Sequence, residues 1–289
     1  MLKPPGMSSA RVVAYVRRRM HGAKVGHAGT LDPEAAGVLP LLIGKAARLF
    51  HDLQNDSKAY IAEIAFGAAT DTQDAQGAVV KTGERIPAEE ELRSLFPALV
   101  GGMAQTPPMY SALKQDGRRL YDLAREGRTV DRKPRAMTLY SLELLQMTQK
   151  SGALISLRCS KGFYVRTLCH DIGEKLGCPA HMRFLLRTAS GMFTLGTAKT
   201  LEEIDCAAAQ GNLQSLLVPV ETVLSHLPHA EVPAEYHKMF LNGVALPLSA
   251  FPALAGIAQG ARVQLRVGGG TVAVALVDGD HLKPATWLG

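Results

Sequence analysis

The chain has 289 residues, 47% hydrophobic and 20% charged, a composition typical of a globular protein with a substantial core and unlike that of a disordered chain. No apolar run is long enough to cross a bilayer, and the first residues lack the apolar stretch of a signal peptide, so we expect a cytoplasmic protein. The net charge of +6 favours a nucleic-acid partner only slightly.

The first predicted element is a helix over residues 10–20, capped by Ser8 and Ser9. A loop that contains glycine and proline follows at 27–33. Residues 35–49 are apolar but interrupted by glycine and proline, which predicts a short helix, a buried strand and another helix opening at Lys45. Residues 58–66 alternate as a β-strand does, with one face made of Tyr60, Ala62, Ile64 and Phe66.

The second half continues with a helix at 89–100, strands at 136–147 and 153–159, and a helix at 166–176 closed by Gly177. Strands and helices that do not alternate regularly predict an α+β fold. Prolines at 219–233 suggest a linker, and 260–288 predicts short strands around glycine turns, a small β-rich appendage.

Cysteine and histidine spacing gives no metal or disulfide pattern. The four cysteines are Cys159, Cys169, Cys178 and Cys206, without C-x-x-C spacing, and the nine histidines show no paired ligand spacing. We therefore expect buried free thiols and no bound metal.

Basic residues gather in three stretches of the chain. Residues 1–31 hold six Lys or Arg and no Asp or Glu, so that Asp32 is the first carboxylate; 114–135 holds eight basic and four acidic residues, and 158–187 six and two. A single stretch is often a solvated face, but three around one carboxylate predict a groove that binds phosphates.

Asp32 lies in an unusual loop, Lys24-Val-Gly-His-Ala-Gly-Thr-Leu-Asp-Pro33. Pro33 holds Asp32 in an extended conformation, and the glycines let the backbone approach a bulky ligand. An Asp before Pro is most often only a turn residue. The basic surroundings of this one favour a catalytic acid.

The stretch Gly26–Pro40 resembles the motif of the TruB family of tRNA pseudouridine(55) synthases. Five further segments are similar to that family in the same order, which makes the resemblance far more specific than any one motif: Lys3–Ser9, Lys58–Tyr60, Thr106–Lys114, Lys161–Leu168 and His181–Arg187. The resemblance implies a mixed, mostly antiparallel sheet in a catalytic domain over 1–228, with an RNA-binding insertion at about 105–135. It also implies a small β-rich, PUA-like domain over 229–289.

Carried onto this sequence, the resemblance implies that Asp32 is the essential aspartate and that Arg166 pairs with it. Tyr60 is expected to stack on the flipped uracil and to take part in proton transfer at the sugar. Tyr164 is expected near the base and Leu185 along its pocket. His27 is expected to fill the gap that the extruded nucleotide leaves.

The resemblance further implies that the substrate is the T-arm of tRNA, that no cofactor or metal is needed, and that the enzyme is a monomer. We expect the tRNA phosphates to meet basic residues of the N-terminal segment and of the insertion, which are Lys3, Lys24, Lys114, Arg118, Arg119, Arg125 and Arg128.

These residue types suit the isomerisation of uridine to pseudouridine at position 55 of the TΨC loop. The reaction breaks the N1–C1′ bond and joins C1′ to C5, without redox or net hydrolysis. A carboxylate can attack or deprotonate the sugar, and an arginine keeps that carboxylate ionised under the base. The base must first leave its stack, which calls for aromatic residues and a basic cradle.

Three other interpretations fit parts of the sequence. A phosphate-binding loop at 37–45 fails, because Leu39 stands where glycine is needed and Ala46 follows Lys45. A hydrolase using Asp71 and Asp74 is disfavoured, since these residues read as a polar turn after the 58–66 strand. The remaining alternative is a non-catalytic tRNA-binding or RNA-folding protein. Asp32, Tyr60 and Arg166 together argue against it, because binding alone needs no buried acid.

Overall fold

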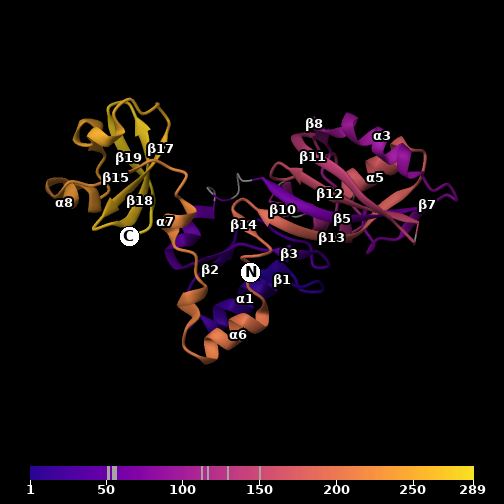
Figure 1. Cartoon of the computed structure of the whole chain (residues 1–289), viewed down its shortest axis with the longest axis horizontal. Helices are drawn as coiled ribbons and strands as arrows, with labels where there is room; N and C mark the ends of the chain where they lie inside the picture. Colours follow the sequence, from indigo (N-terminus) through magenta and orange to yellow (C-terminus); the bar gives the residue numbers. More distant parts are fainter. Residues whose placement is uncertain (51–52, 54–56, 112, 116, 129, 150) are drawn as a thin grey trace. The chain divides into compact units, whose positions relative to one another are not determined.

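The chain forms two compact units in the computed structural model, which describes residues 1–50, 53, 57–111, 113–115, 117–128, 130–149 and 151–289 (Figure 1). Both units are discontinuous in sequence. The first consists of Met1–Ser9, Leu31–Leu39 and Asn55–Ala198. The second consists of Ala10–Thr30, Pro40–Gln54 and Lys199–Gly289.

An eight-stranded sheet dominates the first unit, in the order β1-β3-β13-β5-β12-β11-β8, with β14 beside β13 (Figure 1). Every pairing is antiparallel except that of β3 with β13. The predicted mixed, mostly antiparallel sheet is thus confirmed. The strands are β1 (Leu2–Lys3), β3 (Ala36–Val38), β5 (Lys58–Phe66), β8 (Gly101–Gln105), β11 (Arg135–Thr148), β12 (Gly152–Cys159), β13 (Ala180–Ser190) and β14 (Phe193–Thr194).

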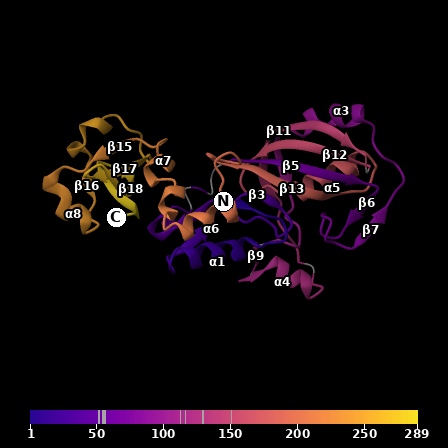
Figure 2. The ribbon, with the colours of Figure 1, turned by 60° about the horizontal axis from the view of Figure 1, so that its bottom comes forward.

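The central strand β5 has the bounds that its alternation predicts. Tyr60, Ala62 and Ile64 are buried and point to one face, as alternate residues of a strand must. Two helices pack on the sheet: α3 (Glu89–Leu99) lies beside β11, and α5 (Val165–Lys175) lies beside β13 (Figure 1, Figure 2). Gly177, with φ of +65°, follows α5 as predicted.

Two short hairpins and a short helix also belong to the first unit. β6 (Ala68–Thr70) pairs with β7 (Val79–Thr82). The insertion carries the hairpin of β9 (Lys114–Gln115) and β10 (Arg118–Arg119), followed by α4 (Leu120–Arg125).

The prediction for residues 35–49 is wrong in its first part, because Ala36–Val38 is a strand and not a short helix. Gly37 has φ of +116°, outside the helical range, and pairs with both β1 and β13. Leu41–Ile43 (β4) is the predicted strand, and the 3₁₀ helix η1 (Gly44–Leu49) takes the place of the second helix.

The second unit begins with the rest of α1 (Ser9–Arg19), which matches the predicted N-terminal helix, and β2 (Val25–His27), which pairs with β4. Val12 and Val16 are the buried face of α1. The later helices are α6 (Leu201–Ala209), η2 (Leu213–Leu216) and α7 (Val220–Val223). Asp205 of α6 accepts hydrogen bonds from Tyr15 and Arg19 of α1, which ties the two helices together.

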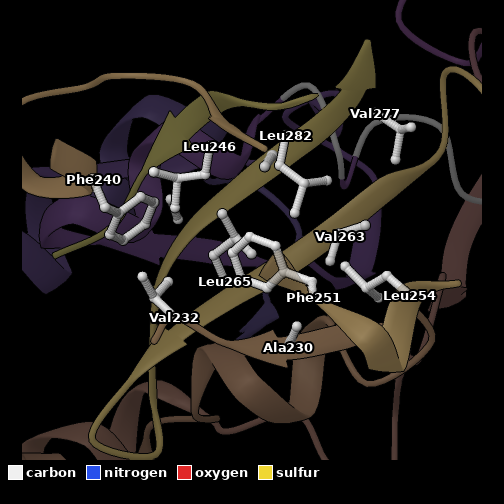
Figure 3. Packing of buried hydrophobic residues seen from close by; sticks show 12 residues of the cluster. Ala230, Val232, Phe240, Leu246, Phe251, Leu254, Val263, Leu265, Val277 and Leu282 are labelled. Atoms are coloured by element: carbon white, nitrogen blue, oxygen red, sulfur yellow. The ribbon is translucent and has the colours of Figure 1, made fainter. Parts of the chain in front are cut away.

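A five-stranded sheet closes the second unit, in the order β15-β17-β18-β19-β16. Its apolar side chains point toward one another, with Phe240, Phe251 and Leu265 among them (Figure 3). The small C-terminal β-rich domain is therefore present. Its elements are β15 (His229–Glu231), η3 (Ala234–Tyr236), α8 (His237–Leu241), β16 (Leu246–Pro247), η4 (Leu248–Ala250), η5 (Pro252–Leu254), β17 (Arg262–Val267), β18 (Gly270–Asp278) and β19 (His281–Trp287).

The predicted domain boundary lies between residues 228 and 229, where β15 begins. The second compact unit is larger than the predicted C-terminal domain, because it also contains residues 199–228 and two N-terminal segments. Among the described residues, no helix has the length and apolarity needed to span a membrane.

Candidate active site

The loop that carries Asp32 is fixed on both sides of the carboxylate. Ser9 Oγ donates to the carbonyl of Leu31 at 2.9 Å and accepts from its N–H at 3.0 Å. Lys3 Nζ donates to the carbonyl of Pro33 at 2.8 Å. The Asp32 side chain itself is 51% exposed. The backbone is thus held in place while the carboxylate is open to a ligand.

Lys3 is fully buried, and its ammonium also donates to the carbonyls of Pro4 and Met7. Burial lowers the pKa of Lys3 to about 8, while the carboxylates of Glu34 and Asp32 oppose that shift. An ammonium with three carbonyl partners and no exposed surface supports the Asp32 loop. The expected contact of Lys3 with RNA stays a prediction.

Arg166, near the start of α5, is the predicted partner of Asp32, and its side chain is 7% exposed. Its Nη2 lies 3.8 Å from Asp32 Oδ2, an ion pair beyond hydrogen-bond length. Its closer contacts are Nη1 to Asp74 Oδ2 at 3.0 Å and Nη2 to the carbonyl of Tyr110 at 2.5 Å. Arg166 thus joins the Asp32 loop, the Asp74 turn and the segment that leads into the insertion.

Asp74 is the site residue that sequence reasoning missed. It lies in the polar turn predicted there, but its carboxylate turns inward and is 17% exposed. Asp74 Oδ1 accepts from Thr72 Oγ1 at 2.7 Å and from the N–H of Gln76 at 3.0 Å, which leaves Oδ2 for Arg166. A carboxylate held by this many donors fixes the guanidinium that faces Asp32. The only signal in the sequence was two acids just after a buried strand.

Tyr60 and Leu185 lie on the adjacent strands β5 and β13 and are both buried. Burial raises the pKa of Tyr60, so its phenol is neutral at physiological pH. The charge of Asp32 adds a little to this rise in the pKa of Tyr60.

Tyr164 immediately precedes α5, and a side-chain amide clamps its backbone. Gln105, buried at the end of β8, accepts from the N–H of Tyr164 at 2.9 Å and donates to its carbonyl at 3.2 Å. The Arg166 guanidinium carbon lies 5.9 Å from the centre of the Tyr164 ring. Gln105 therefore sets the start of the helix that presents Arg166.

Replacing Gln105 by Met should remove both hydrogen bonds at nearly constant volume. The N–H of Tyr164 then lacks an acceptor, whereas the carbonyl of Tyr164 still accepts from the N–H of Leu168 at 3.2 Å. We expect the free energy of unfolding to fall by about 1–3 kcal/mol, the cost of one unsatisfied buried group. Urea unfolding measures it. Gln146→Met on the exposed part of β11 is the matched control, with an expected change below about 0.5 kcal/mol. Equal effects in both variants would contradict the clamp.

The insertion residues predicted to bind RNA are partly described. Arg118 and Arg128 are exposed, and both form ion pairs with Glu126. The hydrogen bond from Arg118 to Glu126 raises the pKa of Arg118. The backbones of Lys114, Arg119 and Arg125 belong to β9, β10 and α4, but their side chains lie outside the described part of the structure.

His27 and Lys24 belong to the second unit. His27 ends β2 opposite Leu41, and exposed Lys24 precedes that strand. The structure thus assembles Asp32, Tyr60, Tyr164, Arg166 and Leu185 within the first unit, whereas these two residues are part of another body.

No group of His, Cys, Asp or Glu that could hold a metal ion is found within the described ranges. The four cysteines are free: Cys159, Cys169 and Cys178 are buried and Cys206 is exposed, which corrects the expectation of burial for that one thiol. Burial raises the pKa of Cys159 to about 12 and keeps this thiol protonated.

Comparison with known proteins shows the family of the chain. Residues 17–165 match the TruB family pseudouridylate synthase N-terminal domain, and residues 166–225 match the tRNA pseudouridylate synthase B C-terminal domain. A tRNA pseudouridine synthase B of Geobacillus thermodenitrificans is 48% identical over 86% of this chain and 85% of its own length. That of Moorella thermoacetica is 42% identical over 97% and 93%.

Solved structures show the same fold at lower sequence identity. A chain of a Cbf5-Nop10-Gar1 complex is similar with a TM-score of 0.74 and 24% identity, over 99% of this chain and 83% of that one. The two matched domains span residues 17–225, and the two relatives cover 86% and 97% of the chain. The chain belongs to the TruB family of pseudouridylate synthases.

Proposed function

We propose that Asp32 is the catalytic carboxylate with which this enzyme isomerises uridine 55 in the TΨC loop of tRNA to pseudouridine. The observation that carries the proposal is the exposed Asp32 carboxylate on a loop fixed by Ser9 and Lys3, with the Arg166 guanidinium beside it. A fixed backbone with an exposed carboxylate supports a role for Asp32 in binding or catalysis rather than in the turn alone.

The chemistry needs one carboxylate that stays ionised beneath a bound base. Asp32 either attacks the ribose carbon and is later displaced by C5, or removes a proton from the sugar and later returns it, as the N1–C1′ bond breaks. The uracil rotates and C5 bonds to C1′, after which C5 loses its proton and N1 gains one. A guanidinium held by Asp74 supports the negative charge on Asp32 without neutralising it by proton transfer, since arginine keeps its proton.

Uridine 55 must leave its stack before Asp32 can reach it. Tyr60 is proposed to face the flipped uracil, with Leu185 on the neighbouring strand lining the pocket and Tyr164 near the base. We propose that His27 fills the space that the nucleotide vacates. We propose that the enzyme acts as a monomer and, because its substrate is tRNA, in the cytoplasm.

Phosphate binding should make tRNA affinity fall steeply with salt. We expect a log–log slope of several units, and each phosphate contact that a substitution removes should reduce the slope by about one. A variant in which Gln replaces Arg118, Arg119 and Arg125 should show a flatter dependence of tRNA affinity on salt, measured by filter binding between low and physiological salt.

The matched control neutralises three cations that pair with carboxylates elsewhere in the first unit, Lys81, Arg85 and Arg93. Its slope should equal that of the wild type. If the two triple variants flatten the slope equally, the effect is one of net charge, and the insertion does not clasp RNA.

Incubation with an unmodified T-arm transcript, followed by chemical mapping of pseudouridine, tests the proposed function. We expect conversion of uridine 55 alone. A transcript that is bound but unmodified would favour the alternative, a tRNA-binding or RNA-folding protein on this fold.

A further inference from the structure

One row of residues crosses five neighbouring strands beneath the Asp32 loop. Lys3 on β1 pairs with Gly37 on β3, and Gly37 pairs with Arg187 on β13. Arg187 pairs with Tyr60 on β5, and Tyr60 with Leu157 on β12. The row therefore places a charged side chain, Arg187, directly opposite the phenol that is proposed to face the uracil.

Gly37 permits this arrangement. A Cβ atom built at Gly37 would lie 2.2 Å from the carbonyl oxygen of Arg187, a backbone atom that cannot move aside. The φ of +116° at Gly37 also disfavours any other residue. Glycine is thus required for β13 to approach β3 closely and to hold the backbone of Arg187 in register.

The Arg187 side chain is buried, with 2% of its surface exposed, at the same depth as the apolar core. Its Nε donates to the carbonyl of Val38 on β3 at 2.7 Å. The strand register sets Arg187 opposite Tyr60. Burial raises the pKa of the Tyr60 phenol, and the Arg187 guanidinium opposes that rise by its charge and as a hydrogen-bond donor. Burying a guanidinium is costly, and a leucine would fill a sheet core more cheaply. Packing alone does not explain a buried charge at this position, whereas an interaction with the Tyr60 phenol does.

We propose that Arg187 is a positioning residue that donates a hydrogen bond to the Tyr60 phenol oxygen and so turns the phenol O–H toward the bound nucleotide. The proposal rests on the function proposed above for Tyr60. A phenol oxygen that accepts from a guanidinium keeps its own proton available, and that proton points away from the cation. The bond to Val38 prevents the guanidinium from following the phenol, so the direction is fixed.

The electrostatics agree with a neutral phenol that donates. Burial raises the pKa of Tyr60, and Arg187 partly opposes that rise. The phenol therefore keeps its proton at physiological pH.

A double-mutant cycle tests the proposal with four proteins: wild type, Tyr60→Phe, Arg187→Lys and the double variant. Single-turnover rates of pseudouridine formation are measured, together with tRNA affinity and thermal stability. Arg187→Lys keeps the charge but loses the planar fork that serves Val38 and Tyr60 at once. We expect it to slow the wild-type rate about tenfold or more and the Tyr60→Phe rate less than about twofold, since residues that act through one another are not additive.

Equal losses in both backgrounds would overturn the proposal and make Arg187 a packing residue of the sheet. A second measurement needs no change at Arg187, in case its variants fail to fold. In ¹⁵N-arginine NMR spectra, Tyr60→Phe should remove exchange protection from one Nη–H of Arg187 and leave Nε–H protected by Val38. Unchanged Nη protection would overturn the contact itself. Because this spectrum is recorded without RNA, it is independent of whether uridine 55 is the substrate.

Discussion

Asp32→Asn is expected to abolish pseudouridine formation and to leave tRNA affinity within about tenfold of the wild-type value. Asparagine has nearly the same size, and the loop is held by backbone contacts to Leu31 and Pro33 that do not involve the carboxylate. The charge that attacks or deprotonates the sugar is removed, whereas binding depends chiefly on phosphate contacts.

The measurement is a single-turnover assay on a T-arm transcript, with affinity determined in parallel by filter binding. Glu34→Gln is the matched control, because Glu34 is an exposed carboxylate two residues along the same loop. It should retain the wild-type rate within about threefold. Normal turnover in Asp32→Asn, or a loss of binding along with turnover, would contradict the assigned role.

Arg166→Lys is expected to lower the single-turnover rate about tenfold or more, equivalent to about 1.4 kcal/mol of activation free energy, with little change in tRNA affinity. Lysine keeps the positive charge but presents one atom on a flexible stem. Arginine presents a fork whose Nη1 is fixed by Asp74 and whose Nη2 faces both Tyr110 and Asp32.

The control for this variant is Arg158→Lys on β12, an exposed arginine that hydrogen-bonds Ser57 and should tolerate the same change. Asp74→Asn should slow the reaction in the same direction as Arg166→Lys, since it weakens the support of the guanidinium. A rate unaffected by Arg166→Lys would show that the fork does not serve Asp32. A fall in affinity that matches the fall in rate would make Arg166 a phosphate contact.

Much of the fold follows from local patterns in the sequence. Strand β5 and the helices α1, α3 and α5 lie within one residue of their predicted bounds, because the spacing of apolar residues and the terminal Gly177 act locally. The predicted cap at Ser9 is wrong, since Ser9 is the first residue of α1 and its hydroxyl bonds Leu31. The strand Ala36–Val38 reads as a helix in the sequence, because its pairing with β1 and β13 comes from segments far away in the chain.

The site shows the same division between local and distant information. The basic, glycine-containing loop around Asp32 predicts a functional acid from local sequence alone, and the resemblance to the family predicts Tyr60 and Arg166 as further site residues. Asp74 reads as a turn residue, since only folding brings it to Arg166, 92 residues further on. The charge of Lys3 suggests RNA contact, whereas its burial against the Asp32 loop comes from the folded structure, and a sequence does not display burial of a lysine.

The most direct test is a structure of this enzyme bound to T-arm RNA that carries 5-fluorouridine at position 55. We expect the nucleotide to be flipped out of its stack, with its sugar or ring in contact with the Asp32 carboxylate, Tyr60 against the base and Arg166 still paired with Asp74. A nucleotide that remains stacked in the loop, or a flipped base bound away from Asp32, would contradict the assignment of this carboxylate as the catalytic group.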